Sequence, residues 1–204
     1  MNITISVPEE TIKEMVKRLD EVKRKPKSVI KAAVNNTSKK AQSLLAQKAS
    51  KVYAGKVAQK GSVISASEIQ KASAETLSAI IKFRSPVHEI KEFHVSSLSL
   101  SKTSYKKNGK RGGRKIKGNV LKGSSKPLDA FVVQFKNGHI SVVSRVPGSK
   151  MKSNPKKEKI RKLLSPSYPV MIKNEKVYGE TSDEIASILS EQVAKVMDKV
   201  LGGK

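Results

Sequence analysis

The chain has 204 residues, which suits one large domain or a domain with arms. Its 42 lysine and arginine residues against 17 acids give a formal charge of +25, so a polyanionic environment is expected, either nucleic acid or an acidic protein surface. The lack of cysteine excludes disulfides and cysteine-ligated zinc, and no stretch reaches the roughly 18 apolar residues of a membrane span.

The N-terminal quarter favours one strand and two helices. Apolar and polar residues alternate over 3–7, which predicts a short strand, and this region lacks the pattern of a signal peptide. A cytoplasmic folding environment is therefore expected. Pro8, followed by two glutamates, predicts the start of a helix. A long helix is expected from Pro26 to about Tyr53, with an apolar stripe opposite a row of lysines.

The middle of the chain ends in the segment with the most biased amino-acid composition. Ser65 and Glu68 have the spacing of a capping box, which predicts a short helix beginning there. Alternation over 77–83 predicts a strand. Residues 101–118 are rich in lysine, arginine and glycine, and no acid occurs between Glu92 and Asp129. Because like charges and glycine oppose compaction, a mobile basic arm is expected at about 101–118.

Residues 129–145 predict a β-hairpin at the centre of the fold. Asn137-Gly138 is typical of a two-residue type I′ turn with both residues at positive φ. That turn places Phe135 opposite Ile140, and side chains then alternate between the two faces. The apolar side chains expected on one shared face are Phe131, Val133, Phe135, Ile140 and Val142.

The C-terminal part carries a second basic stretch and a helix. Two prolines within 163–171 are expected to exclude a regular helix there. Thr181 and Glu184 have capping-box spacing and predict a helix over about 182–201. The expected fold class is α+β: long amphipathic helices packed on an antiparallel sheet, with an extended basic arm. Residues 1–204 are expected to form a single domain.

Catalysis has little support in the sequence. The three histidines, His88, His94 and His139, do not have metal-ligand spacing, and no acid is evident beside His139. Two glycine pairs have the outer spacing of a phosphate-binding loop, but both lack its lysine. The chain is therefore expected not to be an enzyme and to use no cofactor or metal.

The basic stretches are the best candidates for a functional surface. Lysine and arginine pair with phosphates without reading sequence, and the scarcity of aromatic residues argues against base stacking. Three alternatives remain open for these residues: phosphate contact, docking on an acidic partner, or a solvated loop. The candidate DNA or acidic-partner contacts are Lys102, Lys106, Lys107, Lys110, Arg111, Arg114, Lys115, Lys117, Lys150, Lys152, Lys156 and Lys157.

Two linked motifs resemble the prophage minor tail protein Z family. The first is the hairpin with its Lys136-Asn137-Gly138-His139 turn, and the second is Ser165-Pro166-Ser167-Tyr168-Pro169 after the basic stretch. The similarity extends over about 27–171. It departs from the family pattern at Ser165, where a glycine is usual.

This resemblance implies a structural virion protein that is assembled in the bacterial host cytoplasm. Such a minor tail protein would act in tail completion and head–tail joining, at the neck of a tailed phage or prophage. An oligomeric ring around the DNA channel is expected, with tail terminator and head-completion or connector proteins as partners and non-specific contact with DNA. The alternative is a free, non-specific nucleic-acid-binding protein of ribosomal or chromatin type.

Overall fold

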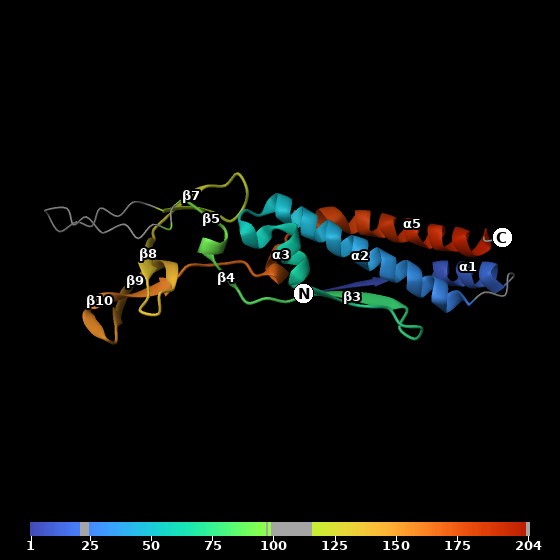
Figure 1. Cartoon of the computed structure of the whole chain (residues 1–204), viewed down its shortest axis with the longest axis horizontal. Coiled ribbons are helices and arrows are strands. Elements are labelled where there is room, and N and C mark those ends of the chain that lie inside the picture. Colours follow the sequence, from blue (N-terminus) through green and yellow to red (C-terminus); the bar gives the residue numbers. More distant parts are fainter. Residues whose placement is uncertain (21–24, 97, 99–115, 203–204) are drawn as a thin grey trace. The chain divides into compact units, whose positions relative to one another are not determined.

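The computed structural model describes residues 1–20, 25–96, 98 and 116–202 (Figure 1). The chain divides into two compact units. Unit 1 comprises residues 1–50, 59–85 and 168–204, and unit 2 comprises 51–58 and 86–167. Helices dominate the first unit and small antiparallel sheets dominate the second, so the α+β class is confirmed.

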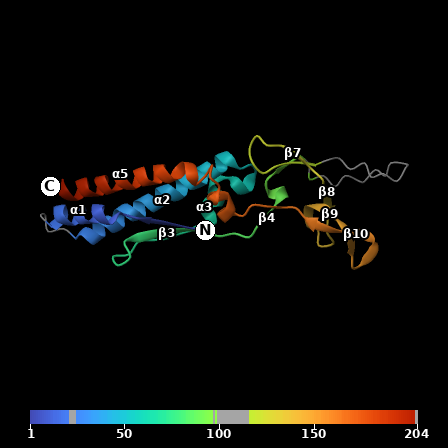
Figure 2. The same ribbon diagram turned by 180° about the vertical axis from the view of Figure 1, so that it is seen from behind.

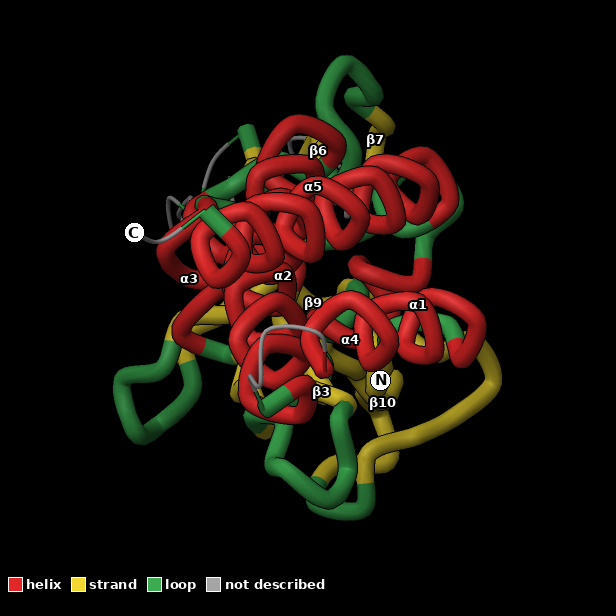
Figure 3. Tube along the Cα trace, turned by 90° about the vertical axis from the view of Figure 1, so that its right-hand side faces the viewer, coloured by secondary structure: helices red, strands yellow, loops and turns green. Residues whose placement is uncertain are grey.

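Unit 1 is built around one long helix. Its elements are β1 (Asn2–Ser6), α1 (Glu9–Asp20), α2 (Pro26–Val52), α3 (Lys60–Ser65), β2 (Ser67–Gln70), β3 (Ser78–Phe83), α4 (Tyr168–Lys173), η3 (Gly179–Thr181) and α5 (Ser182–Leu201). The strands form an antiparallel sheet in the order β1-β3-β2. Helix α2 lies between this sheet and α5, as the view along the helices in Figure 3 shows.

The packing of α2 follows from its composition. Small residues such as Ala33, Ala41 and Ala49 are fully buried on it, together with Val34 and Leu45. Small side chains let neighbouring elements approach α2 closely on more than one side. The helix extends over the length expected from the sequence, and the view from behind shows α5 following the same course (Figure 2). No helix in the described ranges is long and apolar enough to cross a membrane.

Three local expectations in unit 1 are wrong. Ser65 does not begin a helix but ends α3, and the residues after it form β2. A short helix, α4, contains Pro169 in its first turn, where proline is tolerated because no intrahelical N–H donor is needed there. Thr181 precedes α5 as expected, but its hydroxyl donates to the carbonyl oxygen of Val177 and does not cap the helix.

Unit 2 contains several short antiparallel sheets. Its elements are η1 (Lys56–Ala58), β4 (His88–Glu89), η2 (Ile90–Glu92), β5 (His94–Val95), β6 (Ile116–Asn119), β7 (Lys126–Leu128), β8 (Phe131–Gln134), β9 (Ile140–Met151), β10 (Asn154–Lys162) and β11 (Leu164–Ser165). The strand orders are β10-β9-β8, β5-β6-β7 and β11-β4. Ile90, Ile116 and Val142 form a buried cluster, against which Val132 and Leu163 pack.

The expected hairpin is β8–β9, but its turn and register differ from the prediction. The backbone N–H of Gly138 donates to the carbonyl oxygen of Phe135, and that of Phe135 donates to the carbonyl oxygen of His139. Gly138 alone has a positive φ, +80°, whereas Asn137 does not. This is the three-residue loop with a glycine bulge, in which Asn-Gly is also favoured.

The longer loop shifts the register by one residue and changes which side chains are buried. Val132 pairs with Val142, and both contribute to the buried cluster. Phe131 and Phe135 lie on the other face and are only partly buried. A one-residue slip exchanges the two faces of a strand, so the expected aromatic core face is wrong. The hairpin belongs to unit 2, whereas the long helices pack with the sheet of unit 1.

Replacement of Gly138 by alanine tests this turn. Nothing lies within 4 Å of the added Cβ, so backbone strain at φ +80° is the main cost, and we expect about 1 kcal/mol of destabilisation. Native-state hydrogen exchange of the β8–β9 amides measures it. The control Gly61→Ala lies in α3, also in open space and without a positive φ, and should be neutral or slightly stabilising at the α3 amides. Equal effects at both glycines would refute the assigned turn.

Candidate functional site

Positive charge is concentrated in unit 2. By sequence, unit 2 contains 22 lysine and arginine residues against four acids, a formal +18 of the chain's +25. Unit 1 contains 20 against 13, a formal +7. Within unit 2, residues 140–162 hold eight cations and a single acid, Glu158. The β9–β10 hairpin that these residues form is therefore the main basic surface of the described structure.

Strand pairing brings most of the described candidate residues together. Lys150 lies near the end of β9, Lys152 in the turn, and Lys156 and Lys157 on β10, all exposed. Lys117 is exposed on β6, in another sheet of the same unit. The remaining candidates lie outside the described residues: Lys102, Lys106, Lys107, Lys110, Arg111, Arg114 and Lys115.

One face of β10 presents an uninterrupted row of cations. Lys157, Lys159 and Arg161 alternate with Glu158 and Ile160, and the three cations are exposed whereas the two alternating residues are partly buried. Alternate residues on a regular strand lie about 7 Å apart, but the pairing of β10 with β9 changes register on both sides of Glu158, so the three cations share exposure and an even spacing does not follow. Lys159 and Arg161 were absent from the candidates because sequence composition does not show which residues share a face.

The aromatic residues of the hairpin are covered by cations. The guanidinium carbon of Arg145 lies 5.2 Å from the centre of the Phe131 ring, and Nζ of Lys162 lies 5.6 Å from that of Phe135. His139 stacks on Phe135 with ring centres 6.1 Å apart. Cation–π contacts of this kind contribute roughly 0.5–1 kcal/mol each at exposed sites. The rings thus stabilise the hairpin by contacts within it.

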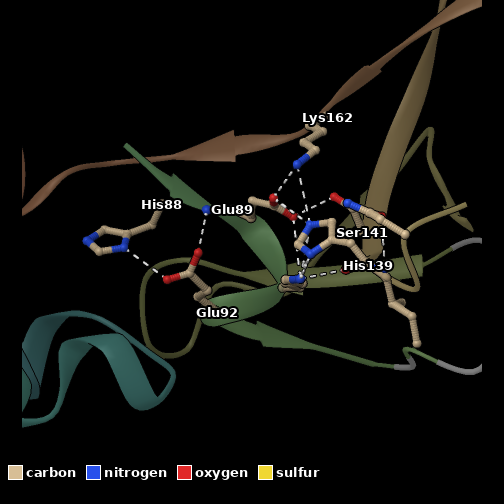
Figure 4. A network of polar contacts seen from close by, with 9 residues as sticks. His88, Glu89, Glu92, His139, Ser141 and Lys162 are labelled. Carbon is tan, nitrogen blue, oxygen red and sulfur yellow. Dashed lines mark hydrogen bonds and ion pairs between the residues drawn. The ribbon is translucent and has the colours of Figure 1, made fainter. Parts of the chain in front are cut away.

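A single carboxylate, that of Glu89, joins the hairpin to the strands beside it (Figure 4). Its Oε2 accepts a hydrogen bond of 2.6 Å from the Ser141 hydroxyl. Its Oε1 lies 2.9 Å from Nε2 of His139 and 2.8 Å from Nζ of Lys162. Nζ of Lys91 is 3.7 Å from Oε2 and also donates to the carbonyl oxygen of Ile140. Residues from β4, η2, β9, β10 and the hairpin loop therefore meet at one group.

These partners hold Glu89 in its ionised form. Burial alone would raise the pKa of Glu89, but the hydrogen bonds from Lys162, Ser141 and His139 and the positive charge of Lys91 outweigh it. Together they lower the pKa from 4.5 to about 2. The side chain of Glu89 is only 15% exposed, so solvent screens this network weakly.

The network has the residue types of a serine–histidine–acid triad but not its geometry. In a triad the histidine bonds to the serine and the acid orients the histidine. Here Ser141 donates to Glu89, and no hydrogen bond joins Ser141 to His139 in the described structure. Among the described residues, no group of three histidine or acidic side chains could hold a metal ion. The arrangement is that of a structural cross-link.

The acid beside His139 is not evident from the sequence. Glu89 lies 50 positions earlier in the chain and meets His139 only through the pairing of β4 with β11 and of β8 with β9. The expectation that His139 has no acidic partner is therefore wrong. The backbone N–H of His139 donates to Oδ1 of Asn137, a local bond typical of asparagine in turns.

Substitution of Glu89 by glutamine should destabilise unit 2 in a pH-dependent manner. Because the folded-state pKa lies below the unfolded value of 4.5, ionised Glu89 stabilises the fold above about pH 4.5, and this contribution is lost as the pH falls toward 2. The shift corresponds to at most about 3 kcal/mol. Denaturant unfolding from pH 7 to pH 2 should therefore show a difference between wild type and Glu89→Gln that shrinks with acidity.

Asp129 provides the matched control. It lies in the same unit and is exposed, so Asp129→Asn should change stability little at any pH. A Glu89→Gln effect that is independent of pH, or equal to that of Asp129→Asn, would exclude Glu89 as the charged centre of the network.

Comparison with known proteins identifies the family. The model of the prophage minor tail protein Z family matches residues 10–201, which include every element from α2 to α5 and nearly all of α1. Searches of curated proteins and of solved structures found no match. Members of the matching family are structural components of phage tails, so the resemblance carried by the hairpin turn and the Pro-Ser-x-Pro motif is confirmed. The chain belongs to the prophage minor tail protein Z family and is a structural tail protein, not an enzyme.

Proposed function

We propose that this tail protein acts in tail completion and head–tail joining, at the head-proximal end of the tail. In this proposal several copies form a ring at the neck of the virion, through which DNA passes. The basic surface of unit 2 contacts that DNA, and unit 1 supplies contacts to other subunits. The observation that carries the proposal is the segregation of charge, with +18 in unit 2 against +7 in unit 1.

The exposed cations of β10 suit contact with DNA that slides through a channel. Lys157, Lys159 and Arg161 can pair with phosphates, whose charge is independent of sequence. Tyr53 and Phe93 are buried, and Phe131 and Phe135 each have a cation over the ring, so little aromatic surface is available for stacking bases in the described part of unit 2. Contact limited to phosphates allows DNA to slide past, which a channel requires.

A ring offers a reason for the high net charge. A monomer with +25 repels itself, whereas subunits around a polyanion have their charge neutralised. Head-to-tail contacts between identical subunits close into a ring when the rotation allows. The partners proposed for such a ring are tail terminator proteins on one side and head-completion or connector proteins on the other.

Salt dependence tests the phosphate contact. Each neutralised phosphate contributes roughly 0.9 to the slope of log affinity against log salt, so Lys157→Gln with Lys159→Gln should lower the slope by about 1.8. Fluorescence anisotropy with double-stranded DNA of mixed sequence measures it. The control pair Lys39→Gln with Lys40→Gln, exposed on α2 in unit 1, should leave the slope unchanged. Equal slopes for both pairs would contradict contact through β10.

Removal of the protein tests whether it is needed to join heads to tails. In a host that makes every other virion protein, its absence should leave filled heads and tails that do not join, because the neck lacks a component. Electron microscopy of the lysate counts joined particles, and supply of the wild-type chain in trans should restore them. Normal joining without the chain would refute a role at the neck.

The charge alone would also suit a free nucleic-acid-binding protein of ribosomal or chromatin type. Membership of a family of structural tail proteins argues against that alternative. Incorporation of the chain into particles, together with weak binding of DNA by the isolated chain, is the result expected for the tail role.

A further inference from the structure

Unit 1 contains an apolar groove between α1 and α5. Its volume is about 550 Å³, within the range of binding pockets that enclose side chains or small ligands. The apolar lining includes Val7, Met15, Leu189, Val193, Met197 and Leu201. Leu201 at its end is 40% exposed, and no element of the described chain fills the space. The groove is therefore an unfilled apolar surface that an apolar side chain could occupy.

The groove is lined by the two acidic helices of a basic chain. Helix α1 contains four acids against three cations, and α5 contains four against two. Helix α2, in contrast, contains six lysines and no acid. Glu14 and Asp198 lie in the groove lining itself, together with the single cation Arg18. An apolar floor with acids at its rim selects an occupant that has an apolar side chain flanked by cations.

The tip of the β9–β10 hairpin has that composition. Met151 is partly exposed at the end of β9, between the exposed Lys150 and Lys152, and Pro155 follows on β10. Methionine adapts to irregular apolar surfaces, and lysine stems lie along such surfaces while their ammonium groups reach outward. Lys150 and Lys152 can thus approach Glu14 and Asp198 when Met151 enters the groove.

We propose that the hairpin tip of one copy docks in the α1–α5 groove of a second copy. The inference rests on the proposed ring and names the contact that builds it. Two different surfaces meet in this contact, so it is heterologous, and repetition around an axis closes a ring. Lys157, Lys159 and Arg161 lie farther along β10 than the tip, so the docked hairpin keeps its row of cations for DNA.

Cysteine pairing between chains tests the contact directly, because the natural sequence has no cysteine. A Met151→Cys chain is mixed with a size-tagged Val193→Cys chain under mild oxidation. We expect the mixed disulfide to form at least about tenfold faster than with a tagged Lys195→Cys chain. Lys195 is on the same helix, outside the groove lining and 66% exposed, so it controls for random collision. Equal rates for the two mixtures would overturn the docking.

Charge reversal provides a second test with its own rescue. Lys150→Glu with Lys152→Glu in the Met151→Cys chain should slow the mixed disulfide about tenfold. Glu14→Lys with Asp198→Lys in the Val193→Cys chain should do the same. Mixing both reversed chains should restore the rate to within about threefold of the original pair, because the charges are complementary again. Failure of this restoration by reversed chains that keep the circular dichroism spectrum and unfolding midpoint of the parent chains would overturn the assigned partners.

The docking and the neck function fail in different ways. If the disulfide fails to form but the chain still joins heads to tails, the docking is wrong and the neck function stands. If the disulfide forms as expected but removal of the chain leaves joining intact, the docking stands and the neck function is wrong.

Discussion

Electrostatic self-repulsion is the constraint on which the arrangement of this chain depends, and it is strongest in unit 2. There, 22 cations face four acids, so few carboxylates are available to neutralise the positive charge. Glu89 meets this demand most fully, because its carboxylate contacts Lys91, His139 and Lys162 as well as Ser141. Arg145 is shared between Glu158, 3.9 Å away, and the ring of Phe131. Acids and aromatic faces are thus both used to hold cations in place.

These contacts do not neutralise the positive charge on the exposed face of β10. Among the described residues, no ion pair joins Lys157 or Lys159 to an acid, whereas Lys162 at the end of the same strand is bound to Glu89. The energetic consequence is that the hairpin surface remains attractive to an external polyanion. For a structural tail protein, the proposed polyanions are DNA and the acidic helices of a neighbouring subunit. Contact with DNA would use the cations along β10, whereas docking would use the tip of the same hairpin.

Elements with long, regular apolar patterns could be predicted from the sequence, whereas contacts between distant segments could not. The strand β1, the helices α1, α2 and α5, and the strand β3 follow from periodicity alone. The β8–β9 hairpin was also expected, but Asn137-Gly138 suits two loop types, and the longer loop reversed the faces of the strand. A proline pair predicts a break in helical structure, yet Pro169 lies in the first turn of α4, where proline is tolerated. No local pattern links Glu89 to His139 across 50 residues.

The proposed ring at the neck is tested most directly by the position of this chain in an assembled particle, determined by cryo-electron microscopy at a resolution that separates the two units. We predict a ring of copies at the head-proximal end of the tail, with the β9–β10 hairpins of unit 2 near the channel and the α1–α5 groove of each copy occupied by its neighbour. Copies located elsewhere on the tail, or hairpins directed to the outside of the particle and away from DNA, would contradict a ring at the neck that contacts DNA through these hairpins.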